Sequence, residues 1–351
     1  MLEIDFLPVA SSTAEGSTKS GDAITGRFTD GDGRQRVIVV DGGYQATGQE
    51  LVDHIRCYYE TQHVDLVIST HPDADHINGL ATVVEQLDVD ELLIHQPRVH
   101  AIPGITSFSN IEAVDALIAV AKDNSTMITE PFTGLERFGG ALQVLSPDED
   151  FYEDLIREHL AQVTAGTKSI SLSSIGLRAR NLLERAVSLL PALETLTDAG
   201  ETNPRNETSV VTLLDVAGHR MLLTGDAGQR ALTRAADRYE AVIGEFEFSP
   251  LALFQVPHHG SRRNIGPTLL DRILGPRYAA FASVSALISA AKDAPKHPSA
   301  KVVNALKRRG ARVVVTAGTP VCHSDGSGMW RAGWGPAPEV PALDEGVEPD
   351  E

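Results

Sequence analysis

The loop between residues 69 and 80 constrains the fold of this chain more than any other stretch, because it joins two different elements. Residues 64–69 form an apolar, strand-like run, and residues 75–87 form a helix-like run. Pro72 cannot continue a central strand, so the chain turns there. The sequence predicts a strand-to-helix loop that is dense in metal-ligand side chains. Two imidazoles and two carboxylates lie within six residues of this loop: His71, Asp73, Asp75 and His76.

Two interpretations of this loop are open. Asp75 and His76 stand at the start of the helix and can aim differently from His71 and Asp73. Four ligand side chains in two directions suit two metal ions better than one. In the other interpretation, the carboxylates cap the helix and the histidines are solvated. The choice depends on whether distant segments bring further ligands to the same place.

The first part of the chain alternates strand and helix patterns, which indicates an α/β fold. Asp41 ends one strand, where a role in fixing the loop is preferred over metal binding. Gly79 follows the metal-type loop, and its missing side chain permits close approach of a neighbouring element. His95 and His100 are single loop histidines, which are more often polar surface. The expected strands are 2–8, 22–28, 35–40, 64–69, 91–94 and 141–145, and the expected helices are 51–59, 75–87 and 111–122.

Two later strands also end in residues that can bind metal. A hairpin of residues 209–214 and 220–224 is followed by Asp226, which can be a ligand or only a helix N-cap. The strand 253–257 is followed by His258 and His259. Because strand tips collect at one edge of a sheet, we expect these side chains to approach the first loop. Ser261, Arg262 and Arg263 come next and supply polar and positive groups for a substrate.

The remaining segments complete the expected organisation. Residues 150–200 read as a helical insertion, with His159 as their one metal-type residue. A strand 278–282, a helix 299–309 and a strand 312–316 follow, with His297 immediately before the proline that begins the helix. Proline, glycine and acidic residues dominate after residue 331. We therefore expect one domain over residues 1–335 and an acidic, disordered tail over residues 336–351.

Composition narrows the class of protein. The formal net charge is −18, and six acidic residues of the last 13 account for a third of it, so coating of the whole surface by nucleic acid is disfavoured. A local basic rim is still compatible with an anionic substrate. Two cysteines, Cys57 and Cys322, make neither a disulfide framework nor a cysteine zinc site. An acidic N-terminus and short apolar runs predict a soluble, cytoplasmic protein with no membrane segment.

In combination and in order, these motifs resemble the metallo-β-lactamase fold superfamily. Within it they are similar to the soluble relatives of the hydrolase domain at the C-terminus of the competence protein ComEC. The resemblance implies an αββα sandwich with a metal site at the edge between two sheets. It covers most of residues 1–330 except the helical insertion. The motifs that carry it are Gly21-Asp22-Ala23, Asp41-Gly42-Gly43, the stretch from His71 to His76, Leu223-Thr224-Gly225-Asp226, His258-His259-Gly260-Ser261 and His297-Pro298.

The resemblance also implies a ligand set for two divalent ions, zinc or manganese. His71 and Asp73 would hold the first ion, Asp75 and His76 the second, and Asp226 would bridge them. His258 is the preferred remaining ligand, with His259 beside it. Asp73 stands where most of the superfamily has histidine, as it does in the competence-protein group, and the histidine usual in the middle of the chain has no clear counterpart. The first site is then weaker, more oxygen-rich or completed by water, and hard oxygen ligands favour manganese relative to zinc, although histidine nitrogen suits both metals.

Such a site predicts a metal-dependent hydrolase in which two ions activate water. Asp75 would orient the nucleophile, and His259 or His297 would bind or protonate a phosphoryl oxygen. Together with the cationic residues after His259, the resemblance favours a phosphodiesterase or nuclease acting on a phosphoester, nucleotide or nucleic acid. Two alternatives are a hydrolase of another ester class, a lactone or thioester, and a binding module with a weakened metal site.

Overall fold

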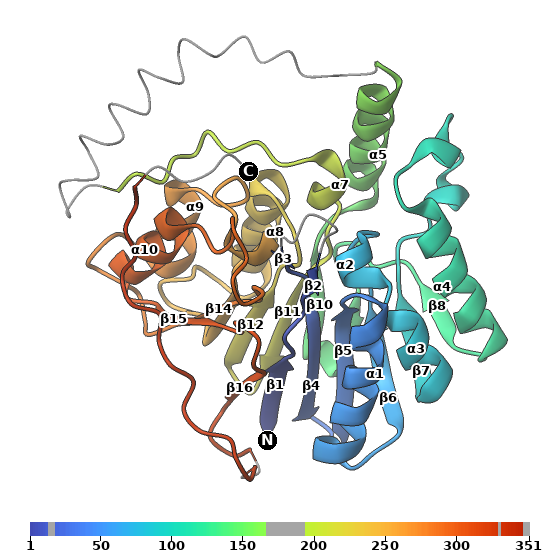
Figure 1. The fold of residues 1–351 in the computed structure, drawn as a ribbon, viewed down its shortest axis with the longest axis horizontal. Coiled ribbons are helices and arrows are strands. Elements are labelled where there is room, and N and C mark those ends of the chain that lie inside the picture. Colours follow the sequence, from blue (N-terminus) through green and yellow to red (C-terminus); the bar gives the residue numbers. More distant parts are fainter. Residues whose placement is uncertain (13–17, 166–193, 329–330, 347–351) are drawn as a thin grey trace.

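Two mixed sheets packed face to face form the centre of the molecule, and helices cover both outer faces (Figure 1). This is a computed structural model, and it describes residues 1–12, 18–165, 194–328 and 331–346. The layers are therefore helix, sheet, sheet, helix. The expected αββα sandwich of the metallo-β-lactamase fold is confirmed.

The first sheet has seven strands in the order β16-β1-β4-β5-β6-β7-β8. From β16 to β5 neighbouring strands are antiparallel, and from β5 to β8 they are parallel. The strands are β1 (Leu2–Phe6), β4 (Ala23–Thr29), β5 (Gln35–Gly42), β6 (His63–Ile68), β7 (Asp88–Leu93), β8 (Met127–Thr129) and β16 (Val321–Ser324). A separate small pair consists of β2 (Ser11–Ser12) and β3 (Thr18–Lys19).

The second sheet repeats this plan in the order β15-β14-β13-β12-β11-β10-β9. Its strands β12 to β15 are parallel, and β9 to β12 are antiparallel. The strands are β9 (Glu136–Arg137), β10 (Leu142–Ser146), β11 (Val211–Val216), β12 (His219–Leu223), β13 (Leu253–Gln255), β14 (Ser285–Ile288) and β15 (Arg312–Val315).

The helices pack on the two outer faces or lie at the edge above the strands. The first group is α1 (Gln45–His54), α3 (Leu80–Gln86) and α4 (Ile111–Asp123), and the second is α8 (Gln229–Val242), α9 (Pro267–Leu274) and α10 (Ala300–Arg308). At the edge are α2 (Ala74–Ile77), α5 (Glu149–Thr164) and α7 (Pro204–Glu207). A π-helix (Ile55–Tyr59) extends α1, and 3-10 turns span Pro97–His100, Ile105–Ser107, Phe138–Gly140 and His258–Gly260.

Alternation along β5 shows how the layers are held together. Val37 and Val39 belong to the core under the helices of the first sheet, whereas Ile38 and Val40 belong to the core between the sheets. Successive strand residues point to opposite faces, and both faces of this strand are buried. A buried strand of this kind is stiff, so it holds the residues at its tip in fixed positions.

Gly79 allows α1 and α3 to pack closely together, next to the loop after β6 that carries His71 to His76. A Cβ atom built on Gly79 would lie 1.9 Å from the backbone oxygen of Gly42 and 2.9 Å from the backbone nitrogen of Gly48. The expected close approach at Gly79 is therefore confirmed. No larger residue fits here without moving one of these backbones.

Several expected elements differ from the structure. Residues 278–282 do not form a strand, and Tyr278 is largely exposed; β14 begins at Ser285 instead. Within the expected insertion, α5 forms but residues 194–200 are not helical, and residues 166–193 lie outside the described part. No pattern in the sequence identified α9 or β16.

The first residues of the expected acidic tail, 336–346, contact the rest of the domain in this structure. The Val340 nitrogen donates to the Val313 oxygen at 2.9 Å, and the Asn304 side chain bonds both the backbone of Leu343 and the carboxylate of Glu345. The segment lies along β15 and α10 because these polar partners compensate its high proline and acid content. Residues 347–351 lie outside the described part. Among the described residues, no helix is long and apolar enough to cross a membrane.

Candidate metal centre

The metal-type residues gather at one edge of the sandwich, beside α2 and α7 (Figure 1). They come from segments far apart in the sequence, and most follow directly on a buried strand. Because β5, β6, β12 and β13 end at this edge, their tips bring these side chains together. The segments are the start of β4 with Asp22, the end of β5 with Asp41, the loop after β6 with His71 to His76, the end of β12 with Asp226, and the turn after β13 with His258 and His259.

Asp226 lies at the centre of this cluster. Its Oδ2 atom is 3.6 Å from His71 Nε2 and 3.6 Å from His258 Nε2, and its Oδ1 atom is 3.4 Å from His76 Nε2. These separations are longer than ordinary hydrogen bonds. They match donor atoms that share one ion, because ligand bonds of about 2.0–2.2 Å place neighbouring donors roughly 3–3.5 Å apart.

His76 and His259 complete the inner part of the cluster. Their rings stack with centroids 5.7 Å apart, and His259 Nε2 is 3.7 Å from Asp75 Oδ2. One donor atom from each of Asp75, His76 and His259 lies within 4.8 Å of the other two. Asp22, Asp226 and His259 meet the same condition. His259 is therefore common to two compact ligand sets.

Five buried polar atoms in this cluster have no hydrogen-bond partner among the described residues. Leaving one such atom buried and unpaired costs about 1–3 kcal/mol, so five together require a common partner. Nitrogen lone pairs and carboxylate oxygens are the donors that a divalent transition-metal ion accepts, so the residues fit such an ion. The atoms are Nε2 of His71, His76 and His259, and Oδ1 of Asp22 and Asp226.

A second layer of contacts fixes the direction of the rings. Asp41 accepts the Thr70 amide at 2.8 Å, the Thr70 hydroxyl at 2.6 Å and His76 Nδ1 at 2.7 Å. His259 Nδ1 donates to the Ser289 backbone oxygen at 2.9 Å. With Nδ1 donating outward, each Nε2 presents its lone pair to the cluster. The contacts of Asp41 agree with its expected role in fixing the loop.

The charges of the site attract a cation. Burial would raise the pKa of Asp226, but His258, His76 and His259 hold it well below its ordinary value, so the carboxylate stays ionised. Burial would lower the pKa of His259, but Asp226, Asp75 and Asp22 raise it to about 9. The same acidic surroundings that favour a proton on this ring favour a metal ion in its place. Burial lowers the pKa of His71 well below its ordinary value, which keeps this imidazole neutral.

Asp73 lies apart from the inner cluster. Its Oδ1 atom is 2.6 Å from Arg205 Nε, and its Oδ2 atom accepts a hydrogen bond from Arg205 Nη2 at 2.8 Å. Asn110 Nδ2 also lies 3.4 Å from Oδ1. His71 Nε2 is 3.8 Å away. The loop therefore sends Asp73 toward α7, whereas Asp75 points toward His259.

The two adjacent histidines take different positions from those expected. His258 is about one-third exposed, and its Nδ1 atom lies 3.1 Å from Asn264 Oδ1 and 3.2 Å from Asn206 Nδ2. His259 is buried with Nε2 directed into the cluster. Both residues have positive φ, which turns the chain sharply between them. His259 Nε2 is thus the more enclosed of the two imidazole nitrogens, while His258 Nε2 approaches Asp226 Oδ2 from the exposed side at 3.6 Å.

A cavity of about 260 Å³ opens beside His258. His297 also lines it, with its ring centroid 5.6 Å from that of His258. Burial and the nearby His259 and His258 lower the pKa of His297 to about 3, so it is neutral. Of the expected substrate residues, Ser261 and Arg263 line this cavity and Arg262 is not among its lining. The other lining residues are Glu201, Thr202, Asn203, Asn206, Asn264 and Lys296.

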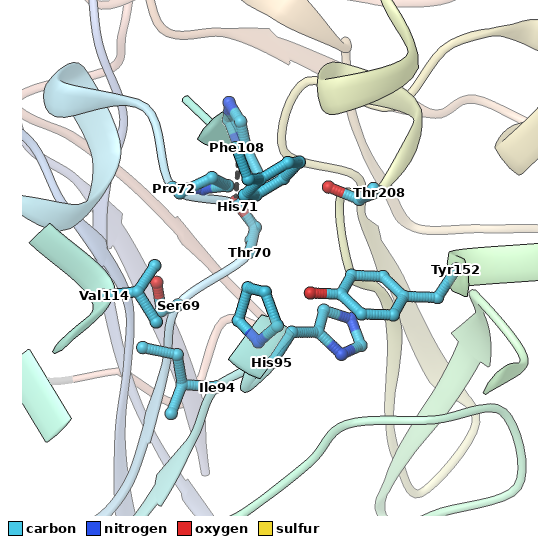
Figure 2. Close-up of a pocket in the computed structure, with 11 residues that line it drawn as sticks. Ser69, Thr70, His71, Pro72, Ile94, His95, Phe108, Val114, Tyr152 and Thr208 are labelled. Atoms are coloured by element: carbon cyan, nitrogen blue, oxygen red, sulfur yellow. Dashed lines mark hydrogen bonds between the residues drawn. The ribbon is translucent and has the colours of Figure 1, made fainter. Parts of the chain in front are cut away.

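A second, smaller cavity lies behind His71 (Figure 2). Its space of about 10 Å³ is near the minimum for one water molecule. His95 projects into it, stacked on Tyr152 with ring centroids 4.1 Å apart. Burial, then the charge of His100, lowers the pKa of His95 to about 3. His95 lines this cavity together with Thr70 and His71, whereas His100 bonds Glu130 and Glu153.

Sequence reasoning missed several residues of the site. Asp22 lies in a motif that carried the family resemblance, but a lone aspartate before a strand has no ligand signature. Asn206 and Asn264 do not directly follow a predicted strand. Because asparagine is common in loops, neither residue carried a signal of a functional site. Arg205 was not singled out by any pattern in the sequence. Only the close packing of α7 against the loop after β6 reveals its contact with Asp73.

Comparison with known proteins gives one family match, over part of the chain. The model described as the metallo-beta-lactamase superfamily matches residues 31–164. Comparison with curated proteins gives no significant match. Similar solved structures include a CmlA beta-hydroxylase mutant, with 12% identity and a TM-score of 0.44, whose alignment covers 92% of this chain and 53% of that one. This chain thus spans about half the length of the hydroxylase.

Two further solved structures extend the comparison. A metallo-beta-lactamase from Pontibacter korlensis has 13% identity and a TM-score of 0.33, over 68% of this chain and 81% of that one. A long form RNase Z from yeast has 11% identity and a TM-score of 0.34, over 98% of this chain and 40% of that one. The family model thus shows similarity to the metallo-beta-lactamase superfamily over residues 31–164, which is less than half of the chain.

Proposed function

We propose that this protein is a metal-dependent hydrolase that cleaves an anionic phosphoester. One observation carries the proposal: five buried, unpartnered donor atoms from four segments converge at one edge of the sandwich. A purely structural polar cluster would pair these atoms with one another. Here they are too far apart for hydrogen bonds and spaced as ligands are around an ion.

The residues that would hold a divalent ion are Asp75, His76, His259 and Asp226, with Asp22 beside them. Such an ion, when bound, supplies Lewis-acid activation of water and of the bond under attack. Asp41 fixes the His76 ring, and Ser289 fixes His259. His71 and Asp73 would belong to the first of the two expected positions. Zinc and manganese both fit imidazole nitrogen with carboxylate oxygen.

We also propose roles in the reaction for three residues at the mouth of the cluster and in the cavity. Asp75 is about one-quarter exposed at the mouth of the cluster, where its carboxylate can orient an attacking water. His258 and His297 line the cavity, where His258 would donate a proton to the leaving group and the neutral His297 ring would bind a phosphoryl oxygen through its N–H group. Relative to the sequence-based assignment, His258 and His259 exchange roles.

Local charge supports a phosphoester as the substrate class. Arg263 and Lys296 line the cavity beside His258, although the whole chain is strongly acidic. A positive rim at an acidic surface concentrates an anionic ester at the one place where it can react. The RNase Z likeness concerns the fold and leaves the substrate open, so single-stranded nucleic acid, cyclic nucleotides and small phosphodiesters all remain candidates.

A substrate screen tests the proposal. Protein freed of metal with a chelator is reloaded with Mn²⁺ or Zn²⁺ and offered single-stranded DNA, RNA, a cyclic nucleotide, bis(p-nitrophenyl) phosphate, a lactone and a thioester. We expect metal-dependent cleavage of at least one phosphodiester. Asp226→Asn should lower the cleavage rate by more than about 100-fold. This is a larger loss than substitutions of residues that only orient the metal ligands produce. Asp154→Asn, an exposed carboxylate on α5, is the matched control. Cleavage of only the lactone or thioester would overturn the substrate assignment.

The finer expectations from the sequence belong to this proposal as well. We place the chain near the soluble relatives of the ComEC hydrolase domain, because Asp73 and the motif His258-His259-Gly260-Ser261 follow that pattern. We also propose one catalytic domain over residues 1–335 and a cytoplasmic location.

A further inference from the structure

Arg205 occupies the side of the site where the first metal ion is expected. It lies on α7, one residue before Asn206, whose Nδ2 atom is 3.4 Å from Asp226 Oδ2. Its guanidinium contacts both carboxylate oxygens of Asp73, at 2.6 Å and 2.8 Å. The side chains of Arg205 and Asp73 are only 21% and 15% exposed. Nη2 donates a hydrogen bond to Oδ2, and Nε lies next to Oδ1 without forming one, so the contact is a largely enclosed ion pair with one charge-assisted hydrogen bond.

This ion pair competes directly with a metal ion for Asp73. A metal ligand must offer a carboxylate oxygen, and both oxygens of Asp73 already face a cation that does not lose its charge. An ion bound to Asp73 would also lie next to the guanidinium, and like charges at that distance repel strongly in a partly enclosed site. Asp73 is accordingly absent from the compact ligand sets formed by the described residues.

The second metal position has no such competitor. His76 Nε2 and His259 Nε2 are buried without partners among the described residues, and Asp75 approaches His259. Asn206 differs from these histidines. It lies near the first position and directs an amide N–H group toward Asp226, and an N–H group cannot bind a metal ion as a lone pair does. The second position therefore offers two unpartnered imidazole nitrogens, whereas the first offers one, His71 Nε2, next to an internal cation and an amide donor.

We propose that Arg205 supplies the positive charge of the first metal position, so that the chain holds one divalent ion tightly and binds the anionic group of its substrate partly through this guanidinium. The proposal rests on the function proposed above. Asp73 uses the Nε and Nη2 edge of the guanidinium, and the remaining N–H groups can donate to a phosphoryl oxygen. Arg205 is thereby a substrate-positioning residue, and Asp73 orients it.

Metal stoichiometry is the primary test. Wild-type protein is dialysed against Mn²⁺ or Zn²⁺, then against metal-free buffer, and the retained metal is counted by inductively coupled plasma mass spectrometry. We expect one ion per chain. Asp73→Asn should still retain one ion. Arg205→Ala, which frees the Asp73 carboxylate, should bind a second ion at least about tenfold more tightly than wild type does. Arg157→Ala, on the exposed face of α5, is the matched control and should change nothing.

The outcomes separate this inference from the proposed function. Two tightly held ions in the wild type, one of them lost in Asp73→Asn, would overturn the role of Arg205 and leave the metal-dependent hydrolase intact. Retention of no ion by the wild type would overturn both. The wild-type and Asp73→Asn counts do not depend on whether Arg205→Ala folds, and circular dichroism checks each variant.

Binding of inorganic phosphate tests the second half of the inference. With one equivalent of Mn²⁺ per chain, isothermal titration calorimetry should show phosphate bound at least about tenfold more weakly by Arg205→Ala than by wild type. Arg205→Lys keeps the positive charge but lacks the planar, forked guanidinium group. Its phosphate affinity should lie between those of the wild type and Arg205→Ala. Equal phosphate affinity in all three proteins would refute direct contact between Arg205 and the anion.

Discussion

Asp41 and His76 are joined by a contact of 2.7 Å between Oδ2 and Nδ1, although 35 residues separate them in the chain. Asp41 ends β5 and His76 lies in α2, and the parallel pairing of β5 with β6 brings the two together. The same carboxylate holds the backbone and hydroxyl of Thr70. One residue thus fixes both the ring that faces Asp226 and the start of the loop that carries His71.

Asp41→Asn should weaken metal binding by about 10–100-fold, as the loss of an outer-layer partner does at other metal sites. Asparagine tolerates the positive φ of 57° at this position, so the backbone is not strained by the change. Competition with a coloured chelator measures the affinity. An unchanged affinity would show that Asp41 does not orient the ligands.

Metal binding should stabilise the fold. Because the ligands come from both sheets, an ion bound at this edge favours the folded chain, by about 2.7 kcal/mol when its concentration is 100 times its Kd. Differential scanning fluorimetry with and without a chelator measures the shift in Tm. Asp226→Asn should abolish the shift, whereas Asp154→Asn should preserve it. A Tm that does not respond to metal in the wild type would argue against a site in the folded protein.

Gly79→Ala should destabilise the protein by more than about 3 kcal/mol, because backbone atoms of Gly42 and Gly48 leave no room for a methyl group. Gly31→Ala is the matched control, since nothing lies within 4 Å of a Cβ there, and it should change stability by less than about 0.5 kcal/mol. The urea concentration at the midpoint of unfolding, compared between the two variants and the wild type, measures this difference in stability. Equal midpoints would mean that α1 and α3 separate more easily than their packing indicates.

Asp5 should make stability depend on acid pH. Burial would raise its pKa, but hydrogen bonds from His54 and Arg331 hold it at about 2. The carboxylate therefore contributes stability that is fully present above its unfolded pKa of about 3.8, and about 2 kcal/mol is lost as the pH falls toward 2. Urea unfolding at pH 6, 4 and 2.5 should show that the free energy of unfolding of the wild type falls with pH. The free energy of unfolding of Asp5→Asn should fall less steeply over the same range. Parallel slopes would contradict the assignment.

The sequence predicted the fold well where local signals and buried periodicity agree. The strands around β5, β6, β12 and β13 were expected at nearly their observed positions, because apolar runs end there in glycine, aspartate or histidine. The strand at 278–282 was wrong, because a short run rich in alanine and aromatic residues does not distinguish a strand from a turn. The packed segment near Val340 was missed because its partners, Val313 and Asn304, are supplied by tertiary contacts.

The candidate site was predictable in its location but not in its pairings. His71, His76 and Asp226 were expected together, and they lie together. The choice between His258 and His259 depended on two positive-φ residues that the sequence does not reveal. The partner of Asp73 lies 132 residues further along the chain, so the spacing of the loop could not predict that Arg205 faces it.

Anomalous X-ray diffraction from crystals loaded with Mn²⁺ or Zn²⁺ tests the central claim most directly, because it locates the ion itself. The account predicts one strong peak at about 2.0–2.3 Å from donor atoms of His76, His259, Asp75 and Asp226, with Asp73 still paired to Arg205. No peak between these residues, or a peak bound by Asp73 in place of Arg205, would contradict it.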